Sequence, residues 1–215
     1  MITRLLAGAA LGLTVLSGTA AADPITGKPL LTDNALYKAG KLPKVACAAK
    51  KGKGRAATEK YIGIVHACLK KVWGVKDMRL ALHYSPIQKH LPTMTVYGFE
   101  GISVALGDDW IKAGDDHRVF HEMASVYGHY ILIRAGISTA HEKLDFGGDL
   151  KVHEQHERRY TYQQDCLAGA AAWALGRPAR NPALKGNELY WFEQGYKAGG
   201  PQACNTWTAS DAKVA

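Results

Sequence analysis

Residues 117–137, HRVFHEMASVYGHYILIRAGI, are the stretch around which the rest of the chain is organised. Apolar side chains recur in it every three or four residues, which is the period of a helix face buried against a core. The opposite face carries His117, His121, Ser125 and His129. Each of these residues is four positions from the next, so their side chains form one stripe along the helix. We expect a long helix that ends at Gly136, and the chemistry of the stripe decides the function.

The chain begins with an expected export signal over residues 1–22. Arg4 precedes an apolar run, and the small residues Ala20 to Ala22 provide a cleavage site before Asp23. The run is too short for a membrane anchor, and no later apolar segment approaches the roughly 20 residues that a membrane helix needs. The mature chain of 193 residues (215 − 22) suffices for one domain with a sizeable core. We therefore expect a secreted protein, extracellular or associated with the cell envelope, without a membrane span.

Composition further divides the mature chain. Residues 23–56 are rich in turn formers and lysines and are expected to form an extended arm with a basic loop, whereas residues 57–215 form the domain. The formal charge is +8, or +7 without Arg4, so the partners could be anionic cell-envelope polymers. A solvated basic loop is the alternative. The chain has neither aromatic interleaving nor a nucleic-acid motif, so nucleic acid is not an expected partner.

The chain contains four cysteines, an even number that fits two disulfides with three connectivities. We favour Cys47–Cys68 and Cys166–Cys204, because each bridge would tie a helix to a neighbouring irregular segment. Buried free thiols are the alternative. No CxxC pair occurs, which argues against a zinc ribbon or a thioredoxin-type site.

The remaining pattern predicts an α+β fold. Apolar periodicity indicates helices over 57–72, 157–175 and 188–198. Strand-like runs lie between 79 and 107, and we expect a small antiparallel sheet there because the connections are too short for helical crossovers. The polar segment from His141 to Glu157 is expected to be a solvated loop. The alternative hypothesis is that the histidines of this segment bind a metal weakly or respond to pH.

Several motifs in order resemble the exported neutral zinc metallopeptidases of actinobacteria. Residues 36–47 resemble the family's opening LYxxGxL…C, residues 68–73 its CLxRxW, residues 127–130 its YGHH, residues 163–169 its QADCFAG, and residues 190–207 its closing RWFxxGFxxGDPxxCNTF. The resemblance covers most of the mature chain. It implies a zincin-like metallopeptidase scaffold, and it supports the same cysteine pairing.

The chain departs from this family where the family does its chemistry. The family's HExGH helix supplies two zinc-binding histidines and a general base, and a glutamate on a later helix completes the site. The aligned residues here are Ser125, Val126, His129 and, for the later glutamate, Thr161. Serine and threonine are poor zinc ligands, and valine cannot accept a proton from water. Of the four positions, only His129 keeps its functional side chain.

A rebuilt metal site is the alternative, with zinc as cofactor and His117, His121 or His129 as ligands. His121 and His129 are separated by about 12 Å of helix rise, which prevents both from binding one zinc. His117 and His121 have ligand spacing, and His153, Glu154 or His156 could complete a displaced site. We expect no cofactor and a catalytically inactive pseudo-peptidase retained for binding a peptide or an envelope polymer. An active metallopeptidase and a basic cell-envelope-binding module are the alternatives.

Overall fold

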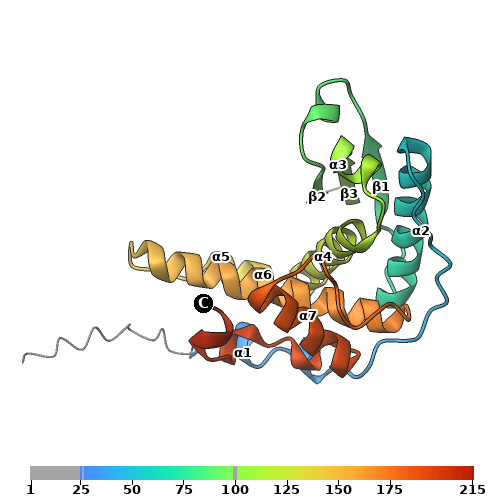
Figure 1. Ribbon diagram of the computed structural model, residues 1–215. Helices are drawn as coiled ribbons and strands as arrows, with labels where there is room; N and C mark the ends of the chain where they lie inside the picture. Colours follow the sequence, from blue (N-terminus) through green and yellow to red (C-terminus); the bar gives the residue numbers. More distant parts are fainter. Residues whose placement is uncertain (1–24, 26, 99–100) are drawn as a thin grey trace, which may run out of the picture.

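The computed structural model describes residues 25, 27–98 and 101–215 and combines helices with one small sheet (Figure 1). The expected export signal lies outside these residues. The long helices are α2 (Arg55–Trp73), α4 (His117–Arg134), α6 (Leu150–Ala174) and α7 (Gly186–Ala198). Short helices are α1 (Pro29–Thr32), α3 (Asp108–Lys112) and α5 (Ile137–Glu142). Helix α4 lies at the centre, in contact with α2 and the sheet on one side and with α6 on the other.

Helix α4 forms as its periodicity predicts. Its core-facing side chains include Val119, Phe120, Met123 and Tyr127, all 2% exposed or less. The helix ends before Gly136, whose φ of +74° is readily accessible only to glycine, and the chain continues into α5. At the start, the Asp115 carboxylate accepts the His117 N–H at 3.0 Å. The histidine stripe is therefore held on a regular helix that is fixed at both ends.

The sheet corrects one expectation. Its strands β1 (Arg79–His83), β2 (Met94–Gly98) and β3 (Gly101–Ala105) lie in the order β1-β3-β2. The β2–β3 pair is antiparallel, as predicted, but β1 and β3 are parallel, so the sheet is mixed. The prediction considered only the short links between successive strands. The crossover from β1 to β3 includes all of β2, which gives it the length that a parallel pair requires.

A second correction concerns residues 141–157, which were expected to be a loop. Helix α5 extends to Glu142 and α6 begins at Leu150, so only the short segment between them is irregular. One polar face of the first half of α6, which includes Gln155 and Arg159, is buried by the C-terminal tail. Arg159, 1% exposed, donates hydrogen bonds to the carbonyls of Thr206 and Ala209 and to the Asp211 carboxylate.

The two disulfides, Cys47–Cys68 and Cys166–Cys204, are the predicted pairs. The first ties the N-terminal arm to α2 and the second ties α6 to the tail. Disulfides are typical of proteins from an oxidising compartment. Among the described residues, none of the helices combines the length and apolar character needed to cross a membrane.

Helices α6 and α7 pack against each other at two glycines. A Cβ on Gly169 would lie 1.8 Å from the Phe192 carbonyl oxygen, and a Cβ on Gly195 would lie 1.8 Å from that of Cys166. Both glycines therefore allow a backbone-to-backbone approach that no larger residue permits. This contact fixes α7 beside the face of α6 that borders the candidate site.

Candidate binding site between α4 and α6

A cavity of about 480 Å³ opens between α4, α6 and the start of α7. Ser125 on α4 and Thr161 on α6, two residues at which the sequence resemblance would place zinc ligands, line this same cavity. Its other lining residues are Arg118, His121, Glu122, Gln164, Asp165, Ala183, Leu184 and Glu188. Two positions that lie 36 residues apart in the sequence therefore meet at one site.

His121 is held by a carboxylate that the sequence analysis did not identify as its partner. Its Nε2 donates to Asp165 Oδ1 at 2.8 Å, and the two side chains are 12% and 3% exposed. Burial disfavours the charged imidazole, but the hydrogen bond and the negative charge of Asp165 outweigh burial and raise the pKa of His121. Position 165 could have been noticed, because an acidic residue at the start of a run of small apolar residues needs a partner when it is buried.

The other Asp165 carboxylate oxygen, Oδ2, is buried and has no hydrogen-bond partner in the described part of the chain. A buried carboxylate that is only half satisfied costs stability. The pair therefore fixes the His121 ring at the cavity wall through one carboxylate oxygen alone.

His129 lies one helical turn beyond Ser125 in a different environment. Its Nδ1 is 2.9 Å from the hydroxyl of Tyr160, and this hydroxyl also hydrogen-bonds the Ser138 hydroxyl. The Tyr160 ring stacks on the His141 ring. Burial lowers the pKa of His129 and raises the pKa of Tyr160 to about 12. The Tyr160 contact orients the imidazole through Nδ1 and leaves Nε2 as the nitrogen that could bind another group.

His117 does not join the other two histidines. It begins α4, and its backbone carbonyl accepts a hydrogen bond from the Asn181 side chain. Twelve residues separate it from His129, about 18 Å of helix rise. His117 and His129 therefore cannot share a metal, and the His121 ring, one turn from His117, is bonded to Asp165.

The residues present do not fit a zinc ion. In the described ranges no three His, Cys, Asp or Glu side chains gather closely enough to share a metal. The same holds for His153, Glu154 and His156, the residues considered for a displaced site. The three positions at which the resemblance places zinc ligands, Ser125, His129 and Thr161, carry one imidazole and two hydroxyl groups, whereas zinc sites use imidazole, thiolate and carboxylate ligands. The nearby imidazole of His121 is bonded to Asp165.

The basic segment of the N-terminal arm is partly engaged within the fold. Lys51 donates to the Ala113 carbonyl at 2.7 Å, and burial lowers the pKa of Lys51. Lys44 lies over the Trp173 ring, 3.5 Å from its centroid, and donates to the Trp173 carbonyl. These two lysines therefore help to attach the arm to the domain.

Comparison with known proteins gives no match to any family model, curated protein or solved structure.

Titration of the histidines gives a testable pH dependence. Burial lowers the pKa of His66, His129, His141 and His156, so the unfolded chain takes up protons near pH 6.5 that the folded chain resists. The free energy of unfolding should therefore fall as the pH decreases from 7 to 5. His121 acts in the opposite sense, since its stabilisation is present below pH 6.5 and is lost as the pH rises through its raised pKa.

Urea unfolding at pH 7 and pH 5 measures this effect. We expect a lower unfolding free energy at pH 5 and a smaller difference in a His66→Gln variant. Equal stability at both pH values would contradict the histidine assignment.

Proposed function

We propose that the chain is an exported pseudo-peptidase that binds a peptide segment in the cavity between α4 and α6 without cleaving it. The observation that carries the proposal is the meeting of Ser125 and Thr161 at one cavity, at the positions where the resemblance places zinc ligands. Ser125, Val126 and Thr161 replace a histidine, a general base and a glutamate of the family motifs.

The chemistry of the cavity wall supports a peptide as the ligand. The hydroxyl groups of Ser125 and Thr161 and the amide of Gln164 can each donate and accept hydrogen bonds, as peptide groups require. Ala183 and Leu184 add an apolar surface for a side chain. A cavity of about 480 Å³ lies within the range of small-ligand sites.

The proposal is tested with untagged chain lacking residues 1–22 and an immobilised library of random decapeptides. We expect binding of a subset of peptides and no cleavage, with or without added zinc. Thr161→Phe places a ring in the cavity from an exposed position and should weaken binding at least tenfold.

The matched control is Lys151→Phe, which adds the same side chain at an exposed position of α6 that does not line the cavity. It should leave peptide binding unchanged. Cleavage of library peptides that a chelator abolishes would contradict the proposal and favour an active metallopeptidase. Equal loss of binding in both phenylalanine variants would place the peptide elsewhere.

A further inference from the structure

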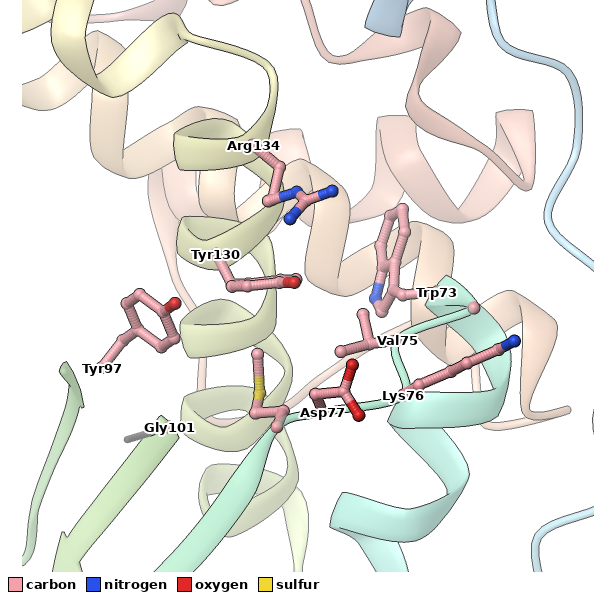
Figure 2. Close-up of a pocket in the computed structure, with 10 residues that line it drawn as sticks. Trp73, Val75, Lys76, Asp77, Tyr97, Gly101, Tyr130 and Arg134 are labelled. Atoms are coloured by element: carbon pink, nitrogen blue, oxygen red, sulfur yellow. The ribbon is translucent and has the colours of Figure 1, made fainter. Parts of the chain in front are cut away.

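A second cavity, of about 470 Å³, lies between the end of α2, the α2–β1 connection, the β2–β3 pair and the second half of α4 (Figure 2). It contains none of the residues that line the cavity between α4 and α6. Figure 2 shows that Arg134 and Tyr130 extend from α4 with their polar ends directed toward Trp73. The carboxylate of Asp77, in the α2–β1 connection, faces the same space from below.

Groups of opposite charge thus face this cavity without neutralising each other. In the residues that the structure describes, the side chains of Arg134, Tyr130 and Asp77 make neither hydrogen bonds nor ion pairs. Two more deeply placed arginines are paired, Arg177 with Asp116 at 2.8 Å and Arg159 with Asp211 at 3.2 Å, whereas Arg134 is exposed to solvent. A cation, a hydroxyl and a carboxylate are therefore available to a ligand.

Aromatic rings form the apolar part of the cavity wall. Trp73, Tyr97 and Tyr130 all line it and are half-buried. The Tyr97 and Tyr130 rings lie edge to face with centroids 5.3 Å apart, an arrangement that fixes both. Half-buried rings beside free charges suit a ligand that has both an apolar group and charged ends.

We propose that this cavity binds a small zwitterion with an aromatic side chain, either an amino acid or a dipeptide. The ligand's carboxylate pairs with Arg134, whose planar guanidinium can donate two parallel hydrogen bonds. Its ammonium group pairs with Asp77, and its side chain packs on the aromatic wall. A simple anion would be repelled by Asp77 and a simple amine by Arg134, so only a ligand with both charges satisfies both residues.

Isothermal titration calorimetry of the mature chain with four probes tests the proposal. Phenylalanine and alanyl-phenylalanine carry both charges, phenethylamine lacks the carboxylate and 3-phenylpropionate lacks the ammonium group. We expect one or both zwitterions to bind, the tighter one identifying the source, and each singly charged probe to bind at least tenfold more weakly. Absence of binding by both zwitterions, or equal binding of the singly charged probes, would overturn the proposal.

Two variants of equal charge change provide the structural control. Arg134→Gln should weaken binding of the zwitterion at least tenfold. Lys76→Gln also removes one positive charge at the cavity, but Figure 2 shows its side chain directed away from the other polar groups, so affinity should change less than threefold. Equal losses in the two variants would show a general charge effect and overturn the proposal, as would unchanged binding by Arg134→Gln.

Discussion

The double variant Ser125→His, Thr161→Glu should bind one zinc per chain with a dissociation constant of about 1 μM or lower, equivalent to about 8 kcal/mol of binding free energy. Together with His129 it would supply two imidazoles and a carboxylate. Tyr160 holds the Nδ1 of His129, and Nε2, which is engaged by no hydrogen bond in the described chain, would supply the second imidazole nitrogen. The unsubstituted chain should bind zinc at least a thousandfold more weakly.

This experiment tests the resemblance directly, since it depends on the alignment of both substituted positions. Val126 remains unchanged, because it packs against the core and is not required for metal affinity. The control is the same double variant with His129→Ala, which removes one ligand and should lose most of the zinc affinity. Circular dichroism establishes that both proteins are folded. A folded double variant that takes up no zinc would show that positions 125, 129 and 161 do not converge, and the metallopeptidase interpretation would then lose its basis.

Local patterns in the sequence predict most of the helices and both disulfides. The stripe of Val119, Phe120, Met123 and Tyr127 identifies α4, because apolar periodicity reports directly on a face buried against a core. The disulfide pairing is predicted because each bridge joins a cysteine within a helix to one in a neighbouring irregular segment, and the structure has these two pairs. The helix is predicted by residues close together in the chain, and the formation of disulfides is predicted by the chemistry of cysteine alone.

The features that the sequence failed to predict depend on distant partners. The first turns of α6, from Leu150 to His156, were expected to be a loop because polar residues such as His153 and Gln155 leave no apolar pattern there. They are nevertheless helical, and the tail buries one polar face of the first half of α6 through the hydrogen bonds of Arg159 and through a bond of 2.8 Å from Gln155 to Asp211. Hydrophobic periodicity cannot detect a buried face that is polar.

The candidate site shows the same limit. Ser125 and Thr161 line one cavity because α4 and α6 pack against each other, a contact that neither helix's own pattern specifies. The pairing of His121 with Asp165 joins residues 44 positions apart, and nothing in the spacing of either helix specifies it. The parallel pairing of β1 with β3 is likewise a property of the topology and not of either strand.

The contact between α6 and α7 leads to the second prediction. Gly195→Ala should lower the free energy of unfolding by more than about 3 kcal/mol, at or above the upper end of the usual cost of overpacking. The new Cβ would lie 1.8 Å from the Cys166 carbonyl oxygen and 3.0 Å from the Ala170 nitrogen, and both are backbone atoms of a regular helix. Neither can move aside as a flexible side chain would, so α7 must shift away from α6.

Urea unfolding measures this loss, and Gly63→Ala is its matched control. Gly63 lies within α2, and a Cβ there would meet no atom within 4 Å. The same substitution should therefore raise the unfolding free energy by about 0.5–1 kcal/mol, since alanine is the better helix former. Opposite signs for one chemical change would separate steric exclusion from helix propensity.

Displacement of α7 would also move Glu188, which lines the cavity between α4 and α6, so any folded Gly195→Ala protein should bind peptide more weakly than Gly63→Ala. Similar stability for the two variants would contradict the close backbone approach on which the position of α7 depends.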